Sequence, residues 1–132
     1  MFAWLVAIVH CLFFNYFRKT VKRWDITVGP HGFTPARVGR DRERYELFCS
    51  TAQVIHPGMR LLIETDVNIS FSKQSYGKIV IDSSLAEYGV SVDGGLLTND
   101  EDIRVVLINK GRVPVALHRG ERFAHLICER IN

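Results

Sequence analysis

Cysteine is scarce and scattered in this sequence, and this excludes two classes of small protein. The three cysteines, Cys11, Cys49 and Cys128, form no C-x-x-C pair and show no Cys/His spacing of the kind that binds zinc. An odd, dispersed set does not build the disulfide framework of a small secreted domain. The sequence therefore predicts no structural metal and favours a reducing, cytoplasmic or nuclear setting.

Other features are missing as well. The 132 residues contain no internal repeat and no low-complexity tract, and hydrophobic residues make up 47% of them. Such a composition is typical of a folded chain and not of a disordered one. The length suits one domain with a core of its own.

The net charge of +3 is unevenly distributed. Between Arg18 and Arg44, eight Lys and Arg residues stand against three Asp and Glu, whereas the rest of the chain carries nine against eleven. A basic segment of this kind can meet phosphates or an anionic membrane surface, or it can be a solvated arm. We expect no nucleic-acid partner.

The N-terminal segment has no polar stripe. Met1–Phe17 is almost wholly apolar, and a cluster of Lys and Arg follows it up to Arg23. The run is shorter than the roughly 20 residues of a spanning helix, and it lacks the charge and cleavage pattern of a secretory signal. It must be covered in one of three ways: by lipid, by packing on the domain as a short helix, or by contact with another copy of the chain. We therefore expect a separate segment at 1–23, possible membrane contact through Met1–Arg23, and a folded domain at 24–132.

Short apolar runs separated by turn residues dominate that domain. Alternation of apolar and polar residues between Gly-containing and Pro-containing turns is typical of antiparallel strands. The runs expected as strands are Trp24–Val28, Tyr45–Cys49, Gln53–Ile55, Arg60–Glu64, Asn68–Phe71, Lys78–Ile81, Val90–Val92, Val105–Ile108, Val113–Leu117 and Phe123–Ile127. Gly29–Arg44 is expected as a loop, and only Ser84–Tyr88 as a turn of helix. The pattern predicts an all-β sandwich or jelly roll.

The C-terminal third carries the most specific signal. It reads VVLIN at 105–109, GERFAHLI at 120–127 and CERI at 128–131. This run resembles the end of trimeric dUTPases (deoxyuridine triphosphate diphosphatases), which read VVLFN, then GDRIAQLI or GERIAQLI, then CERI. The stretches at 65–79 and 83–97 resemble further segments of that family. The resemblance implies a distorted antiparallel jelly roll, a homotrimer, and hydrolysis of dUTP to dUMP and diphosphate with Mg²⁺.

The resemblance also assigns roles to positions in the family's first two site motifs, and both motifs are altered. The family's AGYDL reads RYEL here, so Tyr45 is kept and the longer Glu46 replaces a site Asp. The family's PRSGLA reads IDSSLA, so Asp82 replaces a phosphate-facing Arg and Ser83 is kept. The first change preserves a carboxylate, whereas the second reverses a charge that would hold the triphosphate.

The remaining motifs are altered too. In the third, GVIDEDYRG, Gly95 is kept, Thr98 falls on the catalytic Asp, and Glu101 falls on the Tyr beneath the deoxyribose. A Thr hydroxyl is no general base at neutral pH, and Asp100 would replace it only if the register slipped. In the fourth motif His125 replaces a Gln, and the fifth motif, a Gly-rich closing arm, is absent from the sequence.

Two functions from different classes follow. The first is a non-enzymatic dUTPase-fold protein that binds an unidentified host or viral protein without a cofactor. It would be similar to the early-region proteins of adenoviruses, although Glu129–Asn132 does not match their PDZ-binding tail. The second is a divergent dUTP or nucleotide diphosphatase that uses Mg²⁺ and takes Glu46 or Asp100 as its base. Core positions keep the family's apolar residues while site positions change, which favours the first function.

Overall fold

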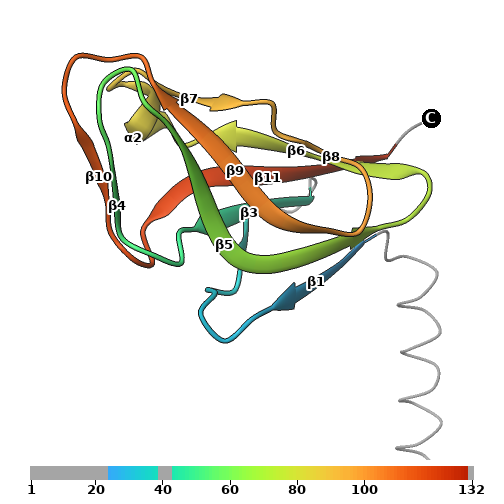
Figure 1. Cartoon of the computed structure of the whole chain (residues 1–132). Helices are drawn as coiled ribbons and strands as arrows, with labels where there is room; N and C mark the ends of the chain where they lie inside the picture. The colour runs from blue at the N-terminus through green and yellow to red at the C-terminus, as the bar shows by residue number, and fades with distance from the viewer. Residues whose placement is uncertain (1–23, 39–42, 131–132) are drawn as a thin grey trace, which may run out of the picture.

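The fold consists of two antiparallel sheets and a short ribbon (Figure 1). The computed structural model describes residues 24–38 and 43–130. One sheet has the order β1 (Trp24–Val28), β5 (Arg60–Phe71), β9 (Glu101–Asn109) and β7 (Val90–Asp93). The other has the order β2 (Ala36–Val38), β3 (Glu43–Phe48), β11 (Arg122–Arg130), β6 (Ser75–Ile81) and β8 (Leu96–Leu97). The ribbon pairs β4 (Gln53–Ile55) with β10 (Val115–Leu117), and one short helix, α2 (Ser83–Ala86), follows β6.

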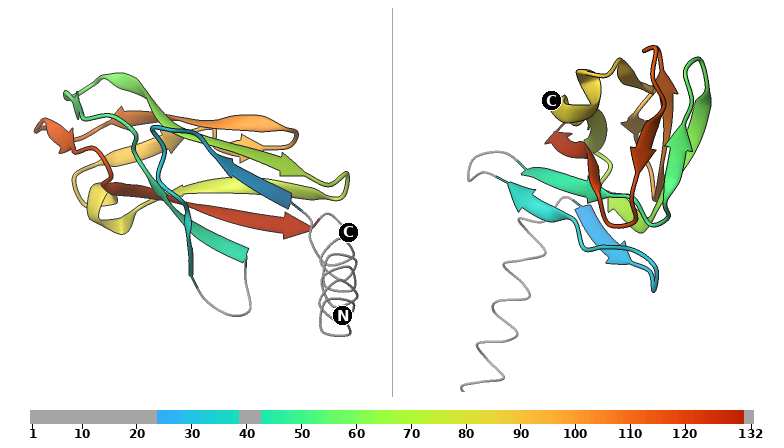
Figure 2. Two further views of the ribbon diagram at one scale, coloured as in Figure 1. Left: turned by 90° about the horizontal axis from the view of Figure 1, so that it is seen from below. Right: turned by 90° about the vertical axis from the view of Figure 1, so that its left-hand side faces the viewer.

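Alternation along the strands decides which face of each sheet turns inward. On β5 every second residue from Ile63 to Ile69 is buried, and on β9 the same holds from Ile103 to Asn109. Because neighbouring side chains of a strand point to opposite faces, each strand presents one apolar row to the core. β11 supplies the facing row from the other sheet, Ala124, Leu126 and Cys128. Figure 2 shows the two layers, with β9 in orange and β11 in red on opposite sides of the core.

The predicted all-β sandwich is confirmed, and so are most of its strands, although three expectations within it are wrong. Residues 60–71 form one strand where two were expected, because the strand bends at a bulge without ending. Ala36–Val38 pairs with β3 inside the expected loop, and Leu96–Leu97 pairs with β6. Both missed strands are too short to show a periodicity, so only their neighbours make them strands.

The bulge in β5 lies between Glu64 and Asn68, where the pairing with β9 shifts. Asp66 sits there with a φ of 53°, the one positive φ among the described residues other than glycine. Thr65 stays buried, and its hydroxyl donates to the carbonyl of Ile103 over 2.8 Å. The backbone of Gly29 donates to the carbonyl of Asp66 over 2.8 Å. Three residues of β5, 65–67, lie opposite the single Ile103 of β9, so β5 has two extra residues here. An even number of extra residues keeps the apolar row of β5 facing inward, while the carboxylate of Asp66 turns toward the loop after β1 and accepts from the backbone of His31.

A buried amide organises the end of the molecule that carries the β4–β10 ribbon. The side chain of Asn109 is fully buried. Its amide nitrogen donates to the carbonyls of Ile55 and Val113, each over 2.8 Å, and its oxygen accepts from the backbone of Gly111 over 2.9 Å. One side chain thus bonds to three backbone groups, one on β4 and two in the turn after β9. Asn109 therefore holds the ribbon against the end of β9.

The described cysteines lie in the core, whereas the N-terminal segment lies outside the described residues. Cys49 and Cys128 are free, buried thiols, and burial raises the pKa of Cys128 to about 12, so this thiol stays protonated at neutral pH. The expected N-terminal helix lies outside the described residues. Within residues 24–38 and 43–130, no helix has the length and apolar character to cross a membrane.

Candidate functional site

Three of the predicted site positions meet on the outer face of the five-stranded sheet. The strand β11 lies between β3 and β6, and its His125 is directly opposite Glu46 on one side and Val80 on the other. The next residues along these strands, Leu126 and Leu47, are buried in the core, so His125 and Glu46 point outward. Asp82 follows the last residue of β6 and reaches the same face.

Asp82 is the centre of this group. It is only 3% exposed, and it caps the N-terminus of α2, where its carboxylate accepts from the backbone of Ser84 over 3.3 Å. The hydroxyl of Ser84 donates to the same carboxylate oxygen. The other oxygen lies 3.1 Å from Nε2 of His125 and 3.1 Å from Nε of Arg122. A buried carboxylate is thereby surrounded by four donor groups.

These donors determine the charge of Asp82. Burial acts to raise the pKa of the carboxyl group, because it removes water from the charged form. The hydrogen bonds from Ser84 and His125, followed by the charge of Arg122, outweigh burial and hold the pKa below its usual 3.8. Asp82 is therefore ionised at neutral pH.

Arg122 joins Asp82 to Glu46. Its Nε lies 3.1 Å from Asp82, and its NH1 lies 3.1 Å from Oε1 of Glu46. The side chain of Arg122 is 47% exposed, whereas that of Glu46 is 22% exposed. Sequence reasoning did not select Arg122 as a site residue. The sequence held no signal for it, because the burial of Asp82, which makes a nearby cation necessary, appears only in the tertiary structure.

His125 contacts the group through one ring nitrogen only. Nε2 is hydrogen-bonded to Asp82, while Nδ1 is buried and has no partner within the described chain. The proton of a neutral ring therefore belongs on Nε2, since a bare nitrogen is less costly to bury than an unpaired N–H. The imidazole acts as a donor to Asp82.

The structure directs Tyr45 away from this group. Tyr45 packs against the core on the inner face of β3, and its hydroxyl accepts from Nε1 of Trp24 over 3.2 Å. The same hydroxyl donates to Glu43 over 3.1 Å. Burial raises the pKa of Tyr45, and Glu43 acts in the same direction. Tyr45 and Glu46, although adjacent in sequence, thus point to opposite faces of the sheet.

The remaining predicted positions lie away from Asp82 or point away from it, at the start of α2, on the turns around β8 and at the start of β9. Ser83, Thr98 and Asp100 are exposed, and no hydrogen bond or ion pair links their side chains to Asp82 within residues 24–38 and 43–130. Gly95 adopts a φ of 94° between β7 and β8, a conformation that glycine allows without strain. Glu101 begins β9, and its Oε2 is buried without a partner in the described chain. Within a single chain, therefore, the third-motif positions Gly95, Thr98 and Glu101 do not contact Asp82.

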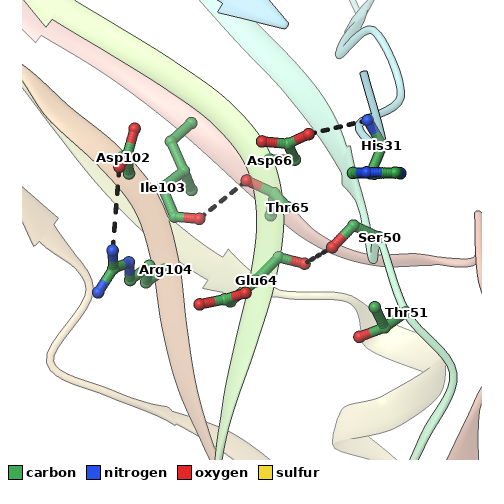
Figure 3. Close-up of a pocket in the computed structure, with 9 residues that line it drawn as sticks. All are labelled: His31, Ser50, Thr51, Glu64, Thr65, Asp66, Asp102, Ile103 and Arg104. Carbon is green, nitrogen blue, oxygen red and sulfur yellow. Dashed lines mark hydrogen bonds and ion pairs between the residues drawn. The ribbon is translucent and has the colours of Figure 1, made fainter. Parts of the chain in front are cut away.

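A pocket of about 270 Å³ lies elsewhere, beside the bulge in β5 (Figure 3). None of the nine residues predicted for the site lines it. Carboxylates from Glu64, Asp66 and Asp102 face it, together with the single cation of Arg104. This excess of negative charge makes the pocket unsuited to a triphosphate.

Comparison with known proteins identifies the family of the chain. A family model described as dUTPase matches residues 40–132. The deoxyuridine 5'-triphosphate nucleotidohydrolase of vaccinia virus (strain Copenhagen) is 37% identical over 102 residues, which cover 74% of this chain and 68% of the viral protein. The chain belongs to the dUTPase family.

Solved structures of dUTPases share the fold. The dUTPase of Staphylococcus bacteriophage 80alpha superposes with a TM-score of 0.76 over 85% of this chain and 92% of that chain, at 15% identity. The EIAV dUTPase superposes with a TM-score of 0.71 over 83% of this chain and 89% of that chain, at 25% identity. The two-sheet arrangement is therefore a dUTPase fold, and the Asp82 group lies on it where β3, β6 and β11 run side by side.

We predict that Asp82 makes the stability of this dUTPase-family protein depend on acid pH. Its pKa is lower in the folded chain than in the unfolded one, so its stabilisation is complete above the unfolded pKa and is lost as the pH falls through the folded pKa. Replacing Asp82 by Asn should lower the free energy of unfolding at pH 7 by about 1–2 kcal/mol, because hydrogen bonds to a charged group are lost. Below about pH 4 the difference between the two proteins should shrink.

The measurement is urea denaturation of the full-length chain and of Asp82→Asn between pH 7 and pH 3. Asp100→Asn is the matched control, since Asp100 is an exposed carboxylate on a turn. A difference between wild type and Asp82→Asn that stays constant down to the lowest pH would contradict the prediction.

Proposed function

We propose that this protein is a non-catalytic member of the dUTPase family that acts by binding another protein. The observation that carries the proposal is the buried carboxylate of Asp82 at the position of the family's phosphate-facing Arg. Arg122, His125 and Ser84 already surround this carboxylate. The degenerate motifs and the similarity to adenoviral early-region proteins belong to the same proposal.

Electrostatics oppose binding of a triphosphate at this face. A nucleotide triphosphate brings several negative charges, and the enzyme must neutralise them before water can attack. Here Asp82 and Glu46 add negative charge, and the nearby cation, Arg122, is held by both. An approaching phosphate would compete with two carboxylates for one guanidinium group.

The residues that would perform the chemistry are also unsuited to it. The reaction needs a carboxylate that orients and deprotonates a water molecule, and Thr98 offers a hydroxyl at that position. Glu101 replaces the Tyr that supports the sugar ring. These substitutions argue against hydrolysis independently of Asp82.

The alternative is a divergent dUTP or nucleotide diphosphatase, and the names of the poxvirus relatives favour it. Such an enzyme would take Glu46 or Asp100 as base and would require Mg²⁺. Mg²⁺ in such an enzyme would be held mainly by the phosphates of the nucleotide and by water, with one or two carboxylates from the protein. Glu46 itself is paired with Arg122. We therefore place the alternative second.

Our first functional prediction is that the full-length protein neither hydrolyses dUTP nor binds it at micromolar concentrations. Diphosphate release in the presence of Mg²⁺ should equal the background rate, and calorimetry with a non-hydrolysable dUTP analogue should show no saturable heat. The vaccinia dUTPase serves as a positive control. Hydrolysis above background would refute the proposal, and loss of that activity in Glu46→Gln or Asp100→Asn would then identify the base.

The second functional prediction is a homotrimer. The outward face of β5 and β9 bears Leu62, which is 42% exposed, directly opposite the half-buried Val106, and Ile108 follows on the same face. Apolar residues on both faces of a strand suit burial on both sides, so a second copy can cover this face. Leu62→Asp places a charge on this face and should reduce the mass of the particle in solution from that of a trimer toward that of a monomer. Val113→Asp, at a 50% exposed position on a loop, should leave that mass unchanged.

Light scattering on the full-length chain and on the chain from Trp24 onward measures this mass. The shorter chain retains every strand of the two sheets. A monomer's mass for both wild-type chains would contradict the trimer.

The third functional prediction concerns residues 1–23, which lie outside the described residues. We propose that they form a segment separate from the domain at 24–132, and that it associates with membranes. Its apolar run needs cover, and each of its four cations would contribute about 1 kcal/mol at an anionic surface. In fractionated cells the full-length chain should sediment with membranes, while the chain from Trp24 onward should remain in the soluble cytoplasmic or nuclear fraction. Recovery of both chains in the soluble fraction would contradict this prediction.

A further inference from the structure

The environment of the Asp82 carboxylate is that of a bound anion. Its two oxygens receive the backbone N–H and hydroxyl of Ser84, the Nε2 of His125 and the Nε of Arg122. These donors come from α2 and from β11, and they converge on a carboxylate that is almost entirely shielded from water. Proteins bind free carboxylates and phosphates with the same set of N–H and O–H donors.

The donors do not have other obvious partners. His125 has no second hydrogen bond within the described chain, because its Nδ1 is buried without one. The Ser84 hydroxyl forms its only side-chain hydrogen bond there with Asp82. Arg122 retains Glu46 as an alternative, but through NH1 and not through the Nε that faces Asp82. Removal of the carboxylate would leave these three side-chain donors and the backbone N–H of Ser84 around a space of its size.

We propose that the Asp82 carboxylate is a tethered anion that fills an oxyanion-binding site formed by Arg122, His125 and Ser84. A free small carboxylate or phosphate would enter this site once the Asp82 carboxylate is removed. In the wild-type chain the site is occupied from within, so that free anions are excluded from it. This inference goes beyond the proposed function and does not require that the protein be inactive.

The test uses the full-length Asp82→Ala variant, in which a methyl group replaces the carboxymethyl group. Loss of the helix cap and of the ion pair should lower its unfolding temperature by about 5 °C or more. Sodium formate, whose anion has the size of the missing carboxylate, should raise that temperature saturably and recover at least half of the loss. Sodium chloride at the same ionic strength is the reference, since salt alone changes screening. Inorganic phosphate is the second probe and distinguishes a site for oxyanions in general from one that fits carboxylates alone.

Three variants separate this site from general salt effects. Asp82→Asn fills the same space without a charge, so formate should raise its unfolding temperature no more than it raises that of the wild type. Asp82→Ala combined with Arg122→Ala removes the principal cation and should lose the response. Asp100→Ala, changed on an exposed turn, should behave like the wild type.

The outcomes are decisive in each case. A formate response confined to Asp82→Ala supports the tethered anion, whereas equal responses of Asp82→Ala and Asp82→Asn overturn it. If Asp82→Ala is unfolded in chloride, formate should restore its β-sheet circular dichroism, and failure to do so also overturns the proposal. Hydrolysis of dUTP by the wild type would end the proposed function and leave the formate response unaffected.

Discussion

The burial of one apolar row from each sheet against the other is the constraint on which the molecule depends. Residues such as Ile63 on β5, Leu107 on β9 and Leu126 on β11 are almost completely withdrawn from water. Burial of each large side chain contributes about 1.5–3 kcal/mol, so these rows supply most of the driving force for folding. Because alternate residues point the other way, the outer faces of the same strands contribute little to this core.

This separation leaves outward positions free to vary while the fold persists. His125 and Glu46 lie on strands whose neighbouring residues, Leu126 and Leu47, hold the core together. A substitution at an outward position leaves that packing intact. The charges on the outer face can therefore vary without disturbing the core, and in this chain Asp82, Arg122 and Glu46 lie there.

The charges on that face form a self-contained group. Asp82 would be costly to bury alone, since an isolated carboxylate in a low-dielectric environment loses its hydration. Arg122, His125 and Ser84 replace that hydration with fixed donors, and Glu46 balances the cation. A network satisfied from within has little affinity left for an outside ligand, which links the stability of this region to the proposed loss of nucleotide chemistry.

The sequence by itself determined the fold class and the family. Period-two alternation and Gly-containing turns are local properties, so they identified β1 and β4 to the residue and predicted the sandwich. The tertiary structure alone decided that Asp82 is paired with Arg122 and His125, because 40 or more residues separate them along the chain. It also decided that Tyr45 and Glu46 serve different faces, that residues 60–71 form one bent strand, and that 36–38 is a strand at all. Each of these depends on which segments lie side by side, and side-by-side placement is set by packing of the whole chain and not by any local run of residues.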